Sequence, residues 1–479
     1  MGEKKLPTII QSLIPIIFLI ILLIINVSIF GDDSLDGSIQ IVLILSSAVA
    51  ASIAFNLGFT WKEIQSGILK SINSSMASIL ILFLVGSLAG SWLLSGIVPA
   101  FIYYGIQILN PNIFLFAACI ICIIVSMATG SSWTTSATIG IALIGIGKAL
   151  NISDGLIAGA ILSGAYFGDK MSPLSDTTNL APAMAGSDLI SHIKYLTITT
   201  VPSIVISLII FIFLGLNINS SIENDNALLI SNIIYEKFYI SPVLFLVPLF
   251  VIFLIYKKVK AVPSLFLGVI LGVVFALIFQ TNLVIEVSDF KGETWISLFS
   301  GIMKSLYGSI KIETSNELVN ELLSSDGMYG MMKTIWLVIS AMIFGGVMEK
   351  AGFLNKISSF IIDRVNSTGS LVASTSGTCI FFNLTASDQY LSIVVPGKMY
   401  SKIYKEKGLA PENLSRTLED SGTVTSVLVP WNTCGAYHAS VLNVPTPMYL
   451  PYCFFSLLSP LMTILVAYLR IKIKTLRSK

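Results

Sequence analysis

Charged residues are scarce in this chain of 479 residues, and long stretches lack them. Asp, Glu, Lys and Arg make up 11% of the sequence, against about 25% in soluble domains, and the mean hydropathy is +0.87. No charged residue occurs at positions 71–147, a run of 77 residues. Because a bilayer span needs about 20 apolar residues, this run alone holds two or three spans. The composition excludes a soluble protein and predicts an all-α polytopic membrane protein.

Arginine, histidine and cysteine are also rare. The four arginines begin at Arg364 and lie near predicted membrane surfaces, which weakens a bidentate clamp for a dicarboxylate. The five cysteines are scattered, which argues against a disulfide framework or a metal cluster. A net charge of +2 gives no indication of nucleic acid binding. The sequence contains no P-loop, HExxH or GxSxG motif, so we expect neither an enzyme nor a primary pump, and no cofactor.

Apolar runs predict fourteen helical segments, some too short to cross a membrane alone. The first run is too long for the apolar region of a signal peptide, so we expect it to be retained. The remaining segments are interrupted by polar insertions near 217–240 and 281–333, the second with an amphipathic piece around Trp295 to Leu323. The predicted segments lie near 9–29, 39–57, 78–98, 100–128, 137–150, 156–168, 197–216, 241–256, 261–279, 334–349, 369–386, 389–403, 417–436 and 447–469.

Basic residues in the short loops predict the orientation. Lys and Arg gather on the cytoplasmic side of membrane proteins. Lys4 and Lys5 precede the first segment, whereas the loop after it, GDDSLDGS, is purely acidic. Further basic clusters follow at 257–260, at 398–416 and in the C-terminal tail. We therefore expect both termini in the cytoplasm. Abundant Ile, Lys and Asn with few Arg suggest an AT-rich genome, and hence the cytoplasmic membrane of a bacterium.

Two halves of the chain, 1–240 and 241–479, carry the same order of features. Each has a short apolar run, a polar tip, a second apolar run and then an acidic motif with proline. The tips are ATGSSWTTSAT (128–138) and FFNLTASDQY (381–390), and the acidic motifs lie at 168–179 and 419–435. Paired interrupted segments at matching positions are the best sequence indication of a transporter binding site.

The residues of these motifs suit a small hard cation such as Na⁺. Proline, Gly, Ser, Thr and Asn permit a helix to unwind, and unwound backbone at membrane depth persists where it is buried in protein or lines a wet cavity. Such a segment presents carbonyl and hydroxyl oxygens, which hard cations prefer. The candidate cation- or proton-binding residues are Asp169, Ser172, Asp176, Thr177, Thr178, Asn179, Asn383, Thr385, Ser387, Asp388, Asp420, Asn432 and Thr433.

The four aspartates carry most of this interpretation. A carboxylate at the centre of a span costs roughly 2.5–3.5 kcal/mol and is by default a functional hypothesis. Such a carboxylate holds either H⁺ or Na⁺, and this competition is the minimal chemistry of exchange. A position at the membrane surface remains the alternative for each aspartate. Asp169 and Lys170 would then end a helix there. Asp420 lies near a predicted cytoplasmic loop.

Two further features belong to the candidate site. The first tip places Ser131, Ser132, Trp133 and Thr134 where they would line a substrate path, although Trp133 is equally compatible with packing. His438 follows the second acidic motif, and an unperturbed histidine titrates near 6.5, which makes it a candidate pH sensor or a structural residue.

The string GSSWTTSATIGIALIGIGKAL (130–150), with AGAILSGAYFGDKMSPLSDTTNLAPAMAGSDL (158–189), resembles the NhaC-type sodium/proton antiporters of the wider ion-transporter group. NLTASDQYLSIVVPGKMY (383–400) and LEDSGTVTSVLVPWNTCGAY (418–437) resemble the same family, and the resemblance covers about 40–470. It implies two inverted repeats, each with a re-entrant hairpin and a broken helix. The hairpin tips would lie at 130–135 and 383–388, and the helix breaks at 172–179 and 430–435.

The leading hypothesis is therefore secondary antiport of Na⁺ against H⁺ across the lipid bilayer. The alternative is a sodium- or proton-coupled carrier of a small organic acid, of the malate/lactate type that the resemblance includes, or of an amino acid. A channel would show repeated pore rings, whereas the twofold repeat favours a carrier. The sequence leaves open a homodimer, the ion selectivity and whether an organic anion or amino acid shares the site.

Overall fold

The computed structural model describes residues 4–30, 37–218, 220–290, 292–362 and 365–476. Within them, seven helical units are long and apolar enough to cross a membrane, and two bent helix pairs raise the number to nine. The all-α polytopic prediction is confirmed. The seven are α1 (Ile9–Phe30), α2 (Ser38–Asn56), α4 (Met76–Leu94), α6 (Pro111–Thr129), α11 (Leu189–Leu216), α14 (Ala261–Phe279) and α18–α19 (Gly327–Lys350).

The first interrupted region begins where α6 ends at a left-handed glycine, Gly130. The chain turns through the polar tip into a short helix, a π-helix and a further helix, and then returns to an interrupted helix pair. A Cβ on Gly130 would lie 2.7 Å from Leu174, so the tip and the break are in direct contact. The elements after α6 are α7 (Ser132–Thr135), η2 (Ser136–Gly140), α8 (Ile141–Ala149), α9 (Asp154–Met171) and α10 (Asp176–Ala185).

The second region repeats this order near the C-terminus. Two helices form a hairpin around a polar tip, and a helix follows that passes through a π turn and a 3₁₀ turn before it breaks near Pro430. The elements are α21 (Thr368–Thr385), α22 (Gln389–Glu406), α23 (Pro411–Leu418), η4 (Glu419–Thr423), η5 (Ser426–Leu428), α24 (Thr433–Leu442), α25 (Thr446–Tyr449), η6 (Leu450–Tyr452) and α26 (Phe454–Tyr468).

Small residues let the helices of the first region approach closely. A Cβ added at Gly164 of α9 would lie 2.2 Å from the carbonyl oxygen of Cys119 on α6, and one at Gly168 would lie 2.6 Å from Ser126. Helix association in membranes depends on such close packing, because lipid removes the hydrophobic drive between helices. The packing fixes α9, and with it Asp169 and Lys170, against α6.

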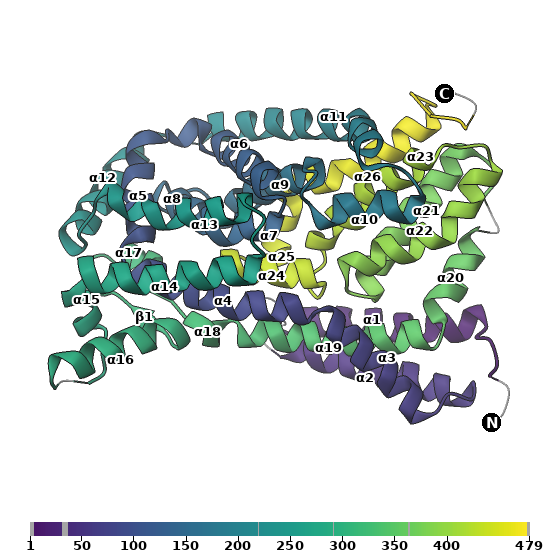
Figure 1. The fold of residues 1–479 in the computed structure, drawn as a ribbon, viewed down its shortest axis with the longest axis horizontal. Helices are drawn as coiled ribbons and strands as arrows, with labels where there is room; N and C mark the ends of the chain where they lie inside the picture. The colour runs from purple at the N-terminus through teal and green to yellow at the C-terminus, as the bar shows by residue number, and fades with distance from the viewer. Residues whose placement is uncertain (1–3, 31–36, 219, 291, 363–364, 477–479) are drawn as a thin grey trace.

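The remaining elements flank these regions (Figure 1). Helices α2, α4, α14 and α19 lie side by side in one layer, and α3 packs against α19. The other bounds are α3 (Trp61–Ser74), α5 (Ile97–Ile108), α12 (Ser220–Lys237), η3 (Pro242–Phe245), α13 (Leu246–Tyr256), α15 (Thr281–Glu286), α16 (Thr294–Tyr307), β1 (Ile310–Lys311), α17 (Glu317–Leu322), β2 (Ser324–Ser325) and α20 (Phe353–Ile362), with β1 and β2 antiparallel.

Three local predictions differ from the structure. The segment expected at 100–128 is two helices, because Asn110 caps a new helix that begins at Pro111, where proline fits the first turn. Helix α3 was not expected, since its apolar residues occupy one face only. The amphipathic piece expected around Trp295 to Leu323 is two short helices, α16 and α17, separated by strand β1, which pairs with β2 after α17.

The described ends of the chain lie at the same end of the helix bundle (Figure 1). Lys5 donates its backbone N–H to Leu57, and Leu476 donates to Gly408. Exposed lysines lie in the segments at this end of the bundle, among them Lys402 near the C-terminal end of α22. The arrangement agrees with termini on one side of the membrane, but it does not identify that side.

Candidate functional site

Asp169 is held by the tip of the first region. The Asp169 carboxylate accepts hydrogen bonds from the backbone N–H of Ser132 at 3.1 Å and from its hydroxyl at 2.6 Å. Only 7% of Asp169 is exposed, which excludes the surface alternative for this residue. Ser131 caps α7 by accepting from the N–H of Thr134, so the tip has a fixed shape. The first tip and the first acidic motif are thus in direct contact.

The first helix break contains both buried and exposed candidates. Ser172 donates to Met127 O at 2.9 Å, and Thr178 donates to the carbonyls of Asp169 and Lys170 at 3.1 Å each. The hydroxyl of Thr177 lies 3.1 Å from that of Ser175, which caps α10. Asp176 and Asn179, in contrast, are exposed, and Asp176 as a cation ligand stays a prediction.

The second tip and the second break form a connected network. Asn432 donates to the backbone and side-chain oxygens of Asn383 at 3.1 Å, and Asn383 donates to Gly422 O at 2.7 Å. Thr433 donates its N–H to Ser387 O at 3.0 Å, and its hydroxyl to Asn432 at 3.4 Å. The hydroxyl of Thr385 bonds within its own helix to Phe381 O.

Strain and burial mark the end of the second tip. Ser387 has a φ of 58°, in the left-handed region that costs non-glycine residues energy, and strain of this kind clusters at functional sites. Its hydroxyl is buried without a hydrogen bond in the described part of the chain. Asp388 is 3% exposed and caps α22, with its carboxylate accepting from the N–H of Leu391 at 2.9 Å. Asp388 is therefore buried and has a structural partner.

A buried ion pair joins the two regions. The side chains of Lys170 on α9 and Asp420 on η4 form a salt bridge, and both are fully buried. Ser459 bonds to each of them, at 2.9 Å to Lys170 Nζ and 3.1 Å to Asp420, and Thr199 donates to Asp420 at 3.2 Å. The second Asp420 oxygen has no partner among the described residues. The surface alternative for Asp420 is therefore excluded.

Lys170 is the functional candidate that the sequence prediction missed. Asp169 and Lys170 side by side are typical of a helix end at the membrane surface. The available indication was that Lys170 ends the motif GAYFGDK, where the two charged residues follow fourteen uncharged α9 residues, Gly155 to Gly168. A lysine placed so deep requires a buried partner.

Arg416 and Glu419 are buried beside this pair without hydrogen bonds. Both are 0% exposed, and none of the three guanidinium nitrogens or two carboxylate oxygens has a partner in the described residues. The Arg416 guanidinium lies 4.6 Å from the centre of the Tyr195 ring. The Arg416 side chain is buried among neighbouring helices, as is most of α23, and its expected position near a membrane surface stays a prediction. Glu419 adds a carboxyl to the interior.

Aromatic rings form a second junction between the regions. Trp133 stacks on Tyr437 of α24 with ring centres 3.9 Å apart, and the Tyr437 hydroxyl donates to Trp133 O at 2.9 Å. His438 is fully buried, with the Tyr166 ring 5.4 Å away, and neither ring nitrogen has a partner among the described residues. The candidate pH sensor therefore lies in an aromatic cluster, apart from the ion pair.

The arrangement brings together hydroxyls, carbonyls and carboxyls rather than a metal cluster. Within the described residues, no three His, Cys, Asp or Glu side chains gather as a metal-binding group. A cation at this site would therefore take most of its ligands from hydroxyl and carbonyl oxygens, as suits a weakly held hard ion. The buried ionisable groups around the two breaks are four carboxyls, Asp169, Asp388, Glu419 and Asp420, and two cations, Lys170 and Arg416.

Comparison with known proteins places this geometry in a family. A model described as "Na+/H+ antiporter family" matches residues 164–471, which include the first break, the ion pair and the second region. The chain belongs to this family. The Na⁺/H⁺ antiporter NhaC of Alkalihalophilus pseudofirmus is 38% identical over 432 residues, 90% of each chain.

Other relatives of similar closeness carry different names. The malate-2H⁺/Na⁺-lactate antiporter of Bacillus subtilis is 34% identical, covering 98% of this chain and 96% of its own. The arginine/ornithine antiporter ArcD of Halobacterium salinarum is 36% identical, covering 98% of this chain and 93% of its own. The family is thus shown, and its members are named for inorganic and for organic solutes.

Proposed function

We propose that this member of the Na⁺/H⁺ antiporter family exchanges Na⁺ for H⁺ by alternating access across the cytoplasmic membrane. One observation carries the proposal: a buried carboxylate, Asp169, is held at the tip of one region, and its chain neighbour Lys170 pairs with Asp420 of the other. Charge is thereby concentrated where two interrupted helices meet. Ionisable residues within membrane segments mark ion pathways and proton relays.

The balance of buried charge favours a cation. Two more carboxyls than cationic groups are buried around the breaks, so the interior would hold excess negative charge if all were ionised. Charge buried without compensation is costly. A bound Na⁺ or a proton relieves that cost, and the two compete for the same carboxylates. An anionic substrate would instead require an excess of positive groups.

The residues then take separate roles. Asp169 supplies the charge for Na⁺, and the oxygens of Ser172, Ser175, Thr177 and Thr178 surround the first break. Lys170 and Asp420 hold the two regions together while the site is closed. Asn383, Asn432 and Thr433, with Asp388, form the corresponding network of the second region. The inverted relation of the two regions and a homodimer remain predictions.

Transport of an organic solute is the second candidate. Its support is the set of relatives named for malate, lactate, arginine and ornithine, together with a cavity of about 700 Å³ beside the second break. A bare cation does not need that much space. Arg416 is the buried group suited to a carboxylate, because its donors are unused within the described chain.

Transport by the purified protein in liposomes tests the proposal. The lumen is acidic and contains a pH-sensitive dye, and Na⁺ is added outside without any organic solute. We expect saturable alkalinisation that is absent from empty liposomes. No response to Na⁺ alone, with a response once malate, lactate or an amino acid is added, would replace the proposal by the second candidate.

A further inference from the structure

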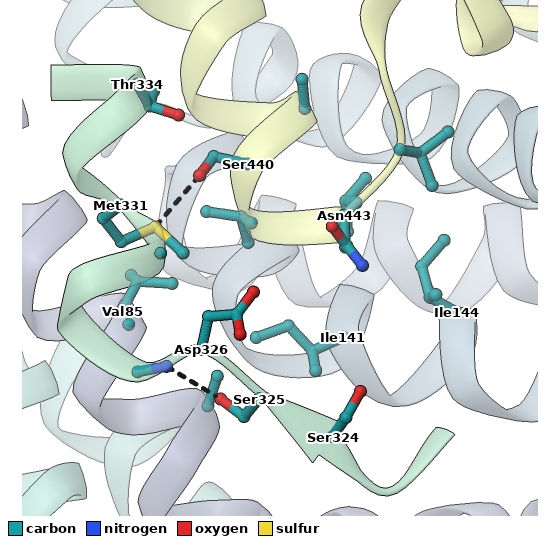
Figure 2. Close-up of a pocket in the computed structure, with 18 of the residues that line it drawn as sticks. Val85, Ile141, Ile144, Ser324, Ser325, Asp326, Met331, Thr334, Ser440 and Asn443 are labelled. Carbon is teal, nitrogen blue, oxygen red and sulfur yellow. Dashed lines mark hydrogen bonds between the residues drawn. The ribbon is translucent and has the colours of Figure 1, made fainter. Parts of the chain in front are cut away.

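A cavity of about 700 Å³ lies between α4, α8, α18–α19 and α24, on the side of the bundle away from the termini (Figure 1). Its lining contains both apolar and polar residues. Figure 2 shows Asp326 and Asn443 directed toward each other across this space, with Ser324, Ile141 and Ile144 around it. Ser324 and Asp326 are exposed, so this part of the lining is in contact with water. The cavity therefore has the size and lining for a cation that keeps part of its hydration shell.

The cavity extends to the second helix break. Pro430 is part of its lining, and the next residue, Trp431, donates its indole N–H to Leu384 O in the second hairpin at 2.8 Å. The inner end of the cavity therefore adjoins the network of Asn383 and Asn432. A solute in the cavity therefore lies beside the second break, and α24 stands between it and the first region.

Helix α24 separates the cavity from the first region. One face, with Ala436, Ala439 and Ser440, lines the cavity, and Ser440 approaches Met331 on the opposite wall at 3.1 Å (Figure 2). The other face carries Tyr437, which stacks on Trp133 of the first tip. A displacement of this single helix would change both the width of the cavity and the contact with the tip.

The two ends of α24 suit such a movement. It begins at the break capped by Asn432 and ends at Asn443, which has a left-handed φ of 53°. Hinges are commonly a few residues at the ends of elements. The helix between these joints has ten residues, so it is short enough to move as a unit.

We infer that this cavity is the route by which the cation reaches the site from the face opposite the termini, and that α24 is the wall that opens and closes it. The inference rests on the proposed function and adds the side of access, the route and the moving element. The small side chains of Ala436, Ala439 and Ser440 then set the width of the route. The lining carries two acidic side chains, Glu321 and Asp326, and two basic ones, Lys148 and Lys333, so the charges along the route balance.

Thiol labelling tests the route. Ser440→Cys is a near-isosteric change, and Thr334→Cys places a thiol on the opposite wall in case the first variant does not fold. Asn282→Cys, exposed on α15, and Lys402→Cys, exposed at the termini's end of α22, are the controls. All variants are exposed in intact cells to a membrane-impermeant maleimide, and the parent protein, whose five cysteines are buried, gives the background.

We expect Ser440→Cys and Thr334→Cys to be labelled from the same side as Asn282→Cys, and Lys402→Cys only from the other side. A bulky maleimide on Ser440→Cys should lower Na⁺-driven exchange at least tenfold, with no loss for Asn282→Cys. Labelling of both cavity positions from the side of Lys402→Cys, or none where Asn282→Cys reacts fully, would overturn the inference. Unchanged exchange after complete labelling would also overturn it. Labelling needs no transport, so a failure of Na⁺/H⁺ exchange in the parent protein is recognised separately.

Discussion

At the scale of single residues, Lys170 and Asp420 form a fully buried ion pair. Removal of one partner from a buried pair leaves an uncompensated charge. We expect Asp420→Asn or Lys170→Gln to lower the free energy of unfolding by about 3–5 kcal/mol. The double variant, with both charges removed, should recover most of that loss. Denaturant titrations in detergent of the parent protein, the two single variants and the double variant measure this double-mutant cycle.

The exposed pair Lys402–Glu406 provides the comparison. The two side chains are 85% and 60% exposed and 3.6 Å apart. Exposed pairs contribute about 0–1 kcal/mol, so Lys402→Gln should change little. A loss for Asp420→Asn as small as that for Lys402→Gln would show that the buried pair is not formed as described.

Asp169 is the residue on which Na⁺ binding should depend. Asp169→Asn keeps an oxygen that accepts from Ser132 but removes the negative charge. We expect a folded protein whose half-saturating Na⁺ concentration rises at least tenfold. Asp188→Asn is the matched control, because Asp188 is an exposed cap of α11 and asparagine caps equally well. Equal Na⁺ dependence of the two variants would remove Asp169 from the site.

The individual roles were only partly predictable. Asp169 and the serines of the tip were found because polar residues at membrane depth are conspicuous against apolar sequence. Lys170 was not singled out, because basic residues near a predicted helix end usually lie at the surface, and only packing shows that its side chain is buried. Asp176 has the same flanking Ser, Thr and Asn as the buried candidates; the sequence does not show that it is exposed, and its role stays a prediction.

At the scale of elements, the contact between α6 and α9 positions Asp169. Gly164→Ala would place a Cβ 2.2 Å from Cys119 O, so the helices must separate. We expect a loss of about 1–3 kcal/mol in unfolding free energy, as for other overpacked interfaces, together with weaker Na⁺ binding. Gly377→Ala, on the open face of α21 with nothing within 4 Å, should be neutral or stabilising by up to about 1 kcal/mol. Thermal unfolding in detergent distinguishes them.

The start of α3 has a pH dependence of its own, outside the spans. A hydrogen bond from Lys4, with a further bond from the Thr60 N–H, lowers the pKa of Glu63 from 4.5 to about 2. Because the folded-state pKa is lowered, this contribution is fully present above pH 4.5 and lost as the pH falls toward 2. Glu63→Gln should therefore lower the unfolding temperature by a constant amount at pH 6–9, with the difference from the parent protein shrinking as the pH falls from 4.5 toward 2. Lys4→Gln should have a similar effect, and a difference that persists unchanged down to pH 2 would contradict the assignment.

Most elements were predictable, and the exceptions have physical causes. Long apolar runs identify spans reliably because a bilayer fixes their length. The division of α5 from α6 was missed, since a proline at a helix start and a proline within a helix look alike in an apolar run. Helix α12 falls in a segment expected to be a polar insertion, because its composition is polar on average.

At the scale of the whole molecule, the orientation remains a prediction with a direct test. The lysines near the described ends lie on one side of the bundle, and basic residues favour the cytoplasm. We expect Lys5→Cys and Lys402→Cys to resist an impermeant thiol reagent in intact cells and to react after permeabilisation. Reaction of Lys5→Cys alone in intact cells would place the two on opposite sides and contradict the arrangement.

The order of features in the two halves was readable from sequence, but the contacts between the halves were not. The tips and breaks can be recognised because Gly, Pro, Ser and Asn stand out within apolar sequence. The pairing of Lys170 with Asp420, and of Trp133 with Tyr437, joins positions 250 and 304 residues apart. Without related sequences to compare, only the folded chain shows which of the many polar residues meet.

Both halves also contain a π-helix, at Ser136–Gly140 and at Glu419–Thr423. A π turn arises when one residue is inserted into an α-helix, and it is frequent at functional sites. Each residue of an α-helix turns the chain by about 100°, so one deletion within 419–423 would rotate Asp420 relative to the rest of its helix, away from Lys170. Insertion or deletion of a single residue here would therefore let relatives gain or lose the buried pair. Alignments of the family should then show one-residue gaps at this position, in sequences whose counterpart of Lys170 is uncharged.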